Sequence, residues 1–407
     1  MTRQEAEEKL AKYGQEQVLR FFDELSETEA GELLSQIEET DFSVLTEDAV
    51  DEEKDKRVIS PIKVLQLPEI EARRDELEAR GLGAIKEGKL GAVLLAGGMG
   101  TRLGSSDPKG MYDIGLTRPV YIFQRLIENL QEVVKKAGCP VRLFVMTSEK
   151  NHEATVSFFE EKDYFGYPKD HVHFFRQEMV PATDYDGKVY MEAKNRIATS
   201  PNGNGGWFTS LDAAGLADLA DKEGIEYLNI FAVDNVLQRI ADPVFFGAVL
   251  EKNSECGSKV VKKNAPDEAV GVMCLKDGRP SIVEYYEMTQ DLMDAKDENG
   301  QPAYNFGVIL NYLFSVKALR RIENDRMPLH VVEKKIPHID ENGDLISPEK
   351  PNGHKYEKLV LDMVEMMESG VPFEVVRERE FAPIKNKTGK DSVESARELL
   401  KLNGYEL

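Results

Sequence analysis

The sequence predicts an α/β protein in which a sheet of short strands alternates with amphipathic helices, preceded by a helical segment. Three observations support this prediction. From Gly88 onward, short apolar runs alternate with stretches of helical periodicity, as is typical of an α/β sheet. From Glu5 to about Glu78 the periodicity is helical throughout. Between Leu95 and Gly110, a run that contains five glycines follows an apolar strand.

The predicted strands and helices follow from these patterns. In the N-terminal segment, Ser26 to Glu29 is typical of a capping box. The clearest helix is predicted from about Pro119 to Lys136, with Gly138 just beyond its end, and another begins at Asp242-Pro243. The strands expected in the sheet are Ala92–Ala96, Val141–Thr147, Val172–Arg176, Tyr227–Val233 and Lys259–Lys262.

The last third of the chain adds a hairpin, a helix and a strand. Val270–Leu275 and Ser281–Glu287 flank Lys276-Asp277-Gly278, which indicates a β-hairpin. A helix is predicted over Tyr356–Ser369 and a strand over Phe373–Arg379.

The length and the net charge of the chain limit the functions that it can have. A chain of 407 residues with 41% hydrophobic content is long enough for two or three domains and a large core. The net charge of −22 argues against nucleic acid or an anionic membrane as a partner, because both require an extended basic surface. A small anionic ligand is not excluded, since it needs only a local group of cations.

The sequence also bears on the compartment. It contains no apolar run near the roughly 20 residues of a membrane span, and the first residues lack the apolar core of a signal peptide. The expected location is therefore the cytoplasm. Three cysteines without CxxC spacing predict neither a disulfide framework nor a zinc site.

The glycine-rich run is interpreted as a phosphate-binding loop. Glycines let main-chain N–H groups approach an anion closely, and Arg102 and Lys109 add two positive charges. The run is not a P-loop, because Lys109 precedes Gly110 instead of following a glycine. It is a near miss to the dinucleotide motif GxGxxG, since Leu103 stands where the third glycine would be. The alternative is a plain connection between a strand and a turn.

Other segments are ambiguous when each is taken alone. Asn202 to Gly206 could contact a ligand through its main chain or be an ordinary turn. Asp234 ends an apolar strand, where a carboxylate can hold Mg²⁺ against phosphate oxygens or simply cap a turn. Glu284 could accept hydrogen bonds from sugar hydroxyls and Lys385 could contact phosphate, although either could be an ordinary solvated side chain.

Taken together and in order, these motifs resemble the eukaryotic-type UDP-N-acetylhexosamine pyrophosphorylases and, more widely, the UDP-sugar pyrophosphorylases. The resemblance runs from Tyr13-Gly14-Gln15-Glu16 to GKDSVESAR near the end of the chain. The motifs between these limits are LAGGMGTRLG, DPKGMYDIGL, GNGGW, FAVDN, DPVFFG, VGV, VEYYE, KKIPHID, KPNGHKYEKLVLD and REREFAPIKN.

The resemblance implies a glycosyltransferase-A-like, Rossmann-type central mixed sheet flanked by helices. The domains expected on this basis are a helical segment 1–88, a nucleotidyltransferase domain 89–385 and a short C-terminal helical remnant 386–407. Eukaryotic relatives continue into a C-terminal domain after the last motif, whereas this sequence ends at Leu407.

The resemblance also implies a reaction and a set of site residues. UTP and a sugar 1-phosphate would yield a UDP-sugar and pyrophosphate with Mg²⁺, and the oligomeric state is left open. Arg102, Lys109 and Lys385 would contact phosphates and act in catalysis, and Asp234 would lie near the metal. The residues implied for the nucleotide are Leu95, Ala96, Gly97, Gly98, Gln177, Gly203 and Asp234. Those implied for the sugar are Asn204, Gly271, Glu284, Tyr285 and Asn305.

One departure from the family bears on the sugar. The family stretch F-N-A-G-N is here Tyr304-Asn305-Phe306-Gly307-Val308, so Val308 replaces an asparagine that helps to hold the N-acetyl sugar. Such a hydrogen bond contributes about 0.5 to 1.5 kcal/mol. N-acetylglucosamine 1-phosphate is the expected substrate, with glucose or galactose 1-phosphate as the alternative. The rivals from other classes are a UDP-sugar sensor without catalysis and a nicotinamide-dependent oxidoreductase.

Overall fold

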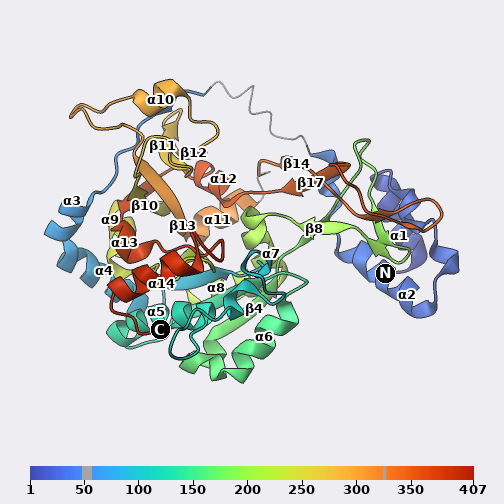
Figure 1. Ribbon diagram of the computed structural model, residues 1–407, viewed down its shortest axis with the longest axis horizontal. Helices are drawn as coiled ribbons and strands as arrows, with labels where there is room; N and C mark the ends of the chain where they lie inside the picture. The colour runs from blue at the N-terminus through green and yellow to red at the C-terminus, as the bar shows by residue number, and fades with distance from the viewer. Residues whose placement is uncertain (48–56, 324–326) are drawn as a thin grey trace. The chain divides into compact units, whose positions relative to one another are not determined.

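The computed structural model describes residues 1–47, 57–323 and 327–407, and its contacts divide the chain into two compact units (Figure 1). The first unit contains Met1–Asp55, Gln177–Trp207 and Met327–Val360. The second contains Lys56–Arg176, Phe208–Arg326 and Leu361–Leu407. Each unit is assembled from three separate stretches of chain. The domain limits 1–88, 89–385 and 386–407 follow the chain order and stay a prediction.

The first unit combines two helices with short strand pairs. Helices α1 (Arg3–Lys12) and α2 (Glu27–Glu39) both begin with capping boxes, and the one at Ser26 and Glu29 confirms the predicted start. Residues from both helices share an apolar cluster with Val189, Met191 and Ile197. The strands pair as β5 (Met179–Pro181) with β8 (Thr199–Pro201), β6 (Met191–Ala193) with β7 (Arg196–Ile197), β14 (His330–Lys334) with β17 (Gly353–Glu357), and β15 (His338–Ile339) with β16 (Leu345–Ile346).

The second unit is built on a mixed sheet, to which ten strands belong among the described residues. Four of them run parallel in the order β9 (Tyr227–Ala232), β2 (Leu90–Leu95), β3 (Arg142–Thr147) and β4 (Val172–Arg176). On the other side of β9, the sheet continues with antiparallel β13 (Phe306–Ser315) and then β11 (Val272–Lys276), which pairs with both β12 (Arg279–Val283) and β1 (Ile59–Ser60). Strand β10 (Cys256–Lys262) pairs with β13, and β18 (Gly370–Glu374) pairs with β10.

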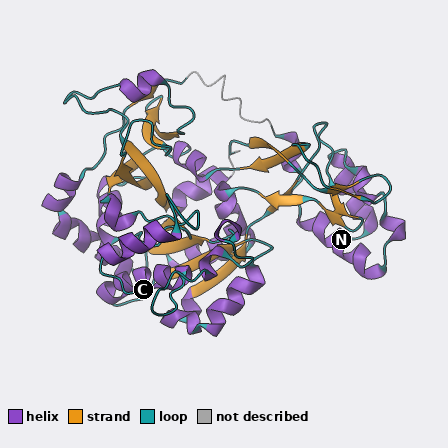
Figure 2. Cartoon of the chain, viewed as in Figure 1, coloured by secondary structure: helices purple, strands orange, loops and turns teal. Residues whose placement is uncertain are grey.

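Helices surround the strands of this sheet (Figure 2). The helices are α3 (Leu67–Ala72), α4 (Arg74–Lys86), α5 (Ile122–Ala137), α6 (His152–Glu161), α7 (Trp207–Ala213), α8 (Leu216–Glu223), α9 (Pro243–Lys252), α10 (Gln290–Asp294), α11 (Val316–Glu323), α12 (Val360–Glu365), α13 (Arg377–Glu380) and α14 (Val393–Leu402). A central mixed sheet flanked by helices is the architecture that the sequence predicts. In the described part of the chain, no helix combines the length and the apolarity needed to cross a bilayer.

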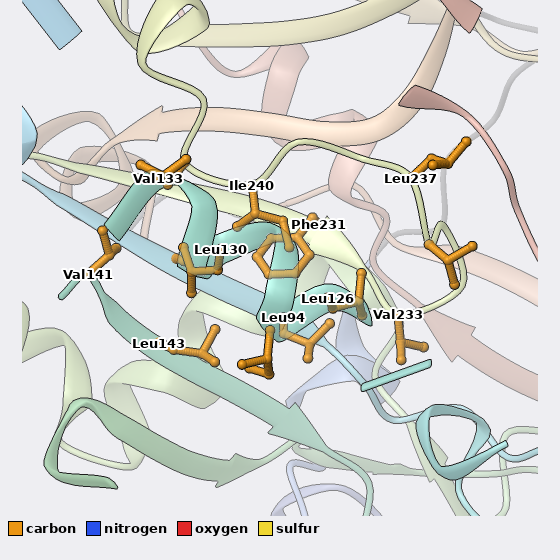
Figure 3. Close-up of a cluster of buried hydrophobic side chains, with 14 of the residues drawn as sticks. Leu94, Leu126, Leu130, Val133, Val141, Leu143, Phe231, Val233, Leu237 and Ile240 are labelled. Carbon is orange, nitrogen blue, oxygen red and sulfur yellow. The ribbon is translucent and has the colours of Figure 1, made fainter. Parts of the chain in front are cut away.

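Helix α5 shows how periodicity builds the core. Figure 3 shows Leu126 and Leu130 of this helix gathered with Leu94 of β2, Leu143 of β3 and Phe231 of β9. These side chains belong to one buried cluster, and none is more than 1% exposed. The helix ends at Gly138, whose φ of 74° is in the left-handed region, as the sequence predicts.

Several predicted elements are confirmed. Helix α9 has Asp242 as its N-cap, whose side chain accepts a hydrogen bond from the Val244 N–H. The predicted hairpin is β11 with β12, and its turn residues Asp277 and Gly278 both have positive φ, as a tight hairpin turn requires.

Three predictions are wrong in part. The helical segment Glu5–Glu78 is interrupted, because residues 57–66 are mainly extended and Pro61 cannot continue a helix. Its residues 48–56 lie outside the described part of the chain. The helix predicted over Tyr356–Ser369 is instead β17 followed by α12, since pairing with β14 holds Tyr356 in a strand. The strand Phe373–Arg379 starts earlier and ends at Glu374, where its pairing with β10 stops, and α13 follows.

Two helices of the second unit pack closely through glycines. A Cβ on Gly81 of α4 would lie 1.9 Å from the Pro243 carbonyl oxygen, and one on Gly247 of α9 would lie 1.9 Å from the Leu77 carbonyl oxygen. Both contacts are with backbone, which cannot rotate away. The spacing of α4 and α9 therefore depends on the two glycines.

Gly81→Ala should lower the free energy of unfolding by about 2 kcal/mol or more, because the two helices must separate to admit a methyl group. Gly83→Ala is the matched control on the same helix, since among the described residues nothing lies within 4 Å of its Cβ position. The free energy of unfolding of Gly83→Ala should rise by up to about 1 kcal/mol, because alanine has a higher helix propensity than glycine. Urea denaturation followed by circular dichroism measures both, and a Gly81→Ala protein as stable as the parent would contradict the packing argument.

Candidate active site

The candidate site lies at the carboxyl ends of β2 and β9. Leu95 of β2 pairs with Ala232 of β9, so the two following segments leave the sheet side by side. The Val233 N–H donates to the Leu95 carbonyl at 3.2 Å, and the Ala96 N–H donates to the Met146 carbonyl of β3 at 2.8 Å. In open α/β sheets ligands bind at this edge. The predicted nucleotide residues Leu95 to Gly98 stand there.

The loop after β2 folds back on itself. The Lys109 N–H donates to the Gly98 carbonyl at 3.0 Å, and the Gly100 N–H donates to the Asp107 carbonyl at 2.8 Å. The fully buried Asn151 holds the start of the loop, because its Nδ2 donates to the Ala96 carbonyl at 2.9 Å. These bonds bring Lys109 back beside the end of β2, 14 residues after Leu95 in the sequence.

Main-chain donors at the start of this loop are available to a ligand. Among the described residues, the N–H groups of Gly97 and Gly98 donate to no protein acceptor. Gly98 is exposed, and nothing in the described part of the chain lies within 4 Å of its Cβ position. Unpaired main-chain N–H groups beside cationic side chains form an anion-binding concavity.

The loop glycines serve different purposes. Gly104 has a φ of 79°, a conformation that favours glycine. Gly110 instead leaves room for a ring, since a Cβ there would lie 2.2 Å from Cζ of Phe123. Gly98 meets neither demand. Its lack of a side chain is therefore unexplained by folding alone and is consistent with close approach of a ligand.

Three predicted cations and one carboxylate gather at this edge. Lys109 is half-buried and interacts electrostatically with Asp234, Arg102 and Lys385. Burial lowers the pKa of Lys109, and the positive charges of Arg102 and Lys385 lower it further against the opposing effect of Asp234. Among the described residues, none of the three cations makes a salt bridge within 4 Å. The charges are thus available to an anionic ligand.

Asp234 is a carboxylate that interacts electrostatically with Lys109 and Lys385. Burial raises its pKa, while Lys109 and Lys385 lower it, and Asp391 adds a second negative charge nearby. The described residues contain no group of three or more His, Cys, Asp or Glu side chains that could hold a metal. Asp234 offers a carboxylate, the kind of oxygen ligand that a hard divalent cation takes together with phosphate and water.

The predicted sugar residues of the second unit form a separate group. A Cβ on Gly271 would lie 3.5 Å from the carboxyl carbon of Glu284, so these two residues are neighbours. The Val308 N–H donates to the Gly271 carbonyl at 2.9 Å. Val308, the residue that departs from the family pattern, therefore lies beside Gly271. Tyr285 is 52% exposed, and the Asn305 carbonyl accepts from the Lys263 N–H at 2.9 Å.

Gln177, Gly203 and Asn204 belong to the first unit. The buried Gln177 donates from Nε2 to the Gly203 carbonyl at 2.5 Å, so these two residues implied for the nucleotide lie together. Oδ1 of Asn204 accepts from the Val360 N–H at 2.9 Å, which gives this side chain a structural role as the cap of α12.

Sequence reasoning did not single out several residues that shape the site. Asn151 holds the glycine loop, Asp391 contributes charge near Asp234, and Asn235 joins the segment after β9 to the segment that carries Lys385. Lys259 is fully buried in β10. Two signals were present: Asn235 is part of the FAVDN motif, and Lys259 is a charged residue directly before Val260 and Val261 in a predicted strand.

The chain is similar in sequence to several known proteins. A family model described as UTP–glucose-1-phosphate uridylyltransferase matches residues 39–403. The UDP-N-acetylhexosamine pyrophosphorylase-like protein 1 of Homo sapiens is 36% identical over 429 residues, which cover 99% of this chain and 84% of that protein. A probable UDP-N-acetylglucosamine pyrophosphorylase of Dictyostelium discoideum is 37% identical, covering 94% of this chain and 83% of that protein.

A solved structure extends the likeness to the fold. The uridine diphosphate N-acetylglucosamine pyrophosphorylase of Trypanosoma brucei, in complex with an inhibitor, has a TM-score of 0.84 and 30% sequence identity, with 98% of this chain and 84% of that chain covered. Since the family model spans most of the sequence and the relatives match nearly all of it, the chain belongs to the family of UTP–glucose-1-phosphate uridylyltransferases.

Proposed function

We propose that the protein is a uridylyltransferase that forms a UDP-sugar and pyrophosphate from UTP and N-acetylglucosamine 1-phosphate. The observation that carries the proposal is the gathering of Arg102, Lys109 and Lys385 around the carboxyl end of β2, beside the unpaired N–H groups of Gly97 and Gly98. A triphosphate is the ligand that such a site fits. The names of the relatives support an N-acetylated hexosamine as the sugar.

The chemistry needs no covalent intermediate with the protein. A phosphate oxygen of the sugar 1-phosphate attacks the α-phosphorus of UTP, the bond from that phosphorus to the bridging oxygen breaks, and pyrophosphate leaves. Such transfers depend on positioning and on cancelling the charge that develops on phosphate oxygens. We assign Lys109 to the α-phosphate, Arg102 to the leaving pyrophosphate and Lys385 to the phosphates as a further cation.

We assign Asp234 to the binding of a divalent cation, and the ion that we propose is Mg²⁺. A bound ion would supply positive charge to the phosphate oxygens, and Asp234 would fix where that charge stands. Within the second unit, we assign Leu95 to Gly98 to the nucleotide and Gly271, Glu284, Tyr285 and Asn305 to the sugar. The assignment of Gln177 and Gly203 to the nucleotide and of Asn204 to the sugar rests on the family resemblance and stays a prediction.

A broader sugar range is the second candidate, and Val308 favours it. A valine cannot donate or accept the hydrogen bond that the family asparagine makes to the sugar. Glucose 1-phosphate and galactose 1-phosphate would then compete with the N-acetylated substrate, because the site would lose one reason to reject them.

The proposed activity is tested by measuring pyrophosphate release from UTP and Mg²⁺ with the 1-phosphates of N-acetylglucosamine, N-acetylgalactosamine, glucose and galactose. Turnover should be highest with N-acetylglucosamine 1-phosphate. Val308→Asn should raise the preference for it over glucose 1-phosphate, measured as the ratio of kcat/KM values, by about 2- to 12-fold, which corresponds to one hydrogen bond. Val308→Ala controls for the loss of bulk and should not raise the ratio. Tight UDP-sugar binding without pyrophosphate release would favour a sensor instead.

Gly98→Ala should raise the Kd for UTP by about tenfold or more, because the added methyl group would stand where the phosphates approach the main chain. The fold should tolerate this change, since no described residue lies near the Cβ position and the φ of Gly98 is not in the left-handed region. Gly110→Ala is the contrasting variant, which should lower thermal stability through its clash with Phe123. Calorimetric titration with UTP and thermal unfolding separate the two effects, and unchanged UTP binding by Gly98→Ala would count against the loop as the phosphate site.

The alkaline limb of the pH profile should report Lys109. Its pKa in the free protein is lowered, so it loses its positive charge below the pH of about 10.4 at which an exposed lysine does. Because kcat/KM reports groups of the free enzyme, it should fall as the pH rises through this lowered pKa. Lys109→Arg keeps its charge and should shift the limb to higher pH, even if its rate is lower throughout. An identical alkaline limb in both proteins would assign it to another group.

A further inference from the structure

Two segments far apart in the sequence are joined behind the proposed phosphate site. One follows β9 and carries Asp234, and the other follows α13 and carries Lys385. The Ile384 N–H donates to the Asp234 carbonyl at 2.9 Å, and the Val236 N–H donates to the Ala382 carbonyl at 3.4 Å. The main chains of the two segments therefore fix each other immediately beside both functional side chains.

The side chain of Asn235 completes this junction. It is 1% exposed, its Nδ2 donates to the Glu380 carbonyl at 2.8 Å, and its Oδ1 accepts from the Ala382 N–H at 2.9 Å. An asparagine is suited to this task because it offers a donor and an acceptor on one short, planar group. Aspartate would keep the acceptor but would set a carboxylate oxygen against the Glu380 carbonyl.

A buried lysine holds the other end of Glu380. Nζ of Lys259 donates to Oε2 of Glu380 at 2.6 Å, to Oδ2 of Asp242 at 2.9 Å and to the Arg239 carbonyl at 3.2 Å. Although burial opposes ionisation of Asp242, the charge of Lys259 holds the pKa of that carboxyl below its usual range. Lys259 thus ties α13 to the segment that ends at the start of α9. Glu380 is fixed by its carboxylate and by its carbonyl, five residues before Lys385.

We propose that Asn235, with Lys259 behind it, is a positioning residue that holds Lys385 at the distance from Asp234 and Lys109 that phosphate transfer requires. The inference rests on the proposed function. Lys385 itself is exposed, and residues 386–390 that follow it are exposed as well. The Lys385 N–H donates to the Asp391 carbonyl at 2.7 Å, and the contacts of residues 380–384 fix the main chain that leads into it. A small displacement of a positioned cation has a large effect on rate.

The test combines Asn235→Asp with Lys385→Ala in a double-mutant cycle, using pyrophosphate release to obtain kcat and the KM for UTP. Asn235→Asp should lower kcat about tenfold or more in the otherwise unchanged protein. On the Lys385→Ala background, Asn235→Asp should lower kcat further by less than about twofold. Its effect depends on displacing the Lys385 ammonium group, which that background no longer has. A merely structural role would lower kcat by the same factor on both backgrounds.

Asn129→Asp is the matched control. Asn129 of α5 is also buried, and its Nδ2 donates to the carbonyls of Val236 and Gln238 in the same segment. In the described part of the chain, its side chain makes no hydrogen bond to residues 380–384. This variant should lower thermal stability and leave kcat within about twofold. Equal losses of kcat in the two variants would overturn the inference, since they would show that any disturbance of the segment after β9 is enough.

If Asn235→Asp does not fold, Asn235→Ser provides an uncharged variant. We expect its loss of kcat to depend on Lys385 in the same way. Full activity of a folded Asn235→Ser or Asn235→Asp protein would overturn the inference, as would unchanged kcat in Lys385→Ala. Failure of the proposed function has a different signature, because the unmodified protein would then release no pyrophosphate with any sugar 1-phosphate.

Discussion

The parallel pairing of β2 with β9 is the constraint on which the rest of the site depends. Leu95 and Ala232 are register partners, so the glycine loop and the segment with Asp234 start at the same edge of the sheet. An antiparallel arrangement would place one of them at the opposite end of a six-residue strand, about 20 Å away. No change of side chains could then bring Lys109 near Asp234.

The electrostatics of this edge are arranged for a ligand that is highly negative. In a chain of net charge −22, burial lowers the pKa of Lys109 and raises that of Asp234, so neither ionised form is fully stabilised by the protein alone. Phosphate oxygens would stabilise the charged lysine, and a cation would stabilise the charged aspartate. Charges that are fixed before the ligand arrives need little reorganisation during the reaction, which is the condition for electrostatic catalysis.

How much of this structure the sequence predicts depends on how far apart in the chain the interacting residues lie. Helix α5 and the parallel strands were predictable because their periodicity is local. Residues 353–357 instead form a strand because they pair with β14, some 20 residues earlier in the chain. Motifs supplied Lys109, Asp234 and Lys385 as candidates, and their roles remain predictions. Asn235 and Lys259 were missed because their importance comes from Glu380, more than 100 residues later in the chain, and spacing carries no information about such a contact.

The residues proposed for the transfer of phosphate and for the choice of sugar come from different strands of one sheet. Asp234 follows β9 and Lys109 follows β2, whereas Val308 lies on β13 and Gly271 immediately precedes β11. The bond between the Val308 N–H and the Gly271 carbonyl is made by main chain, so a different side chain at position 308 would leave it in place. We therefore expect a substitution of Val308 to change the sugar preference without displacing the main chain at Gly271.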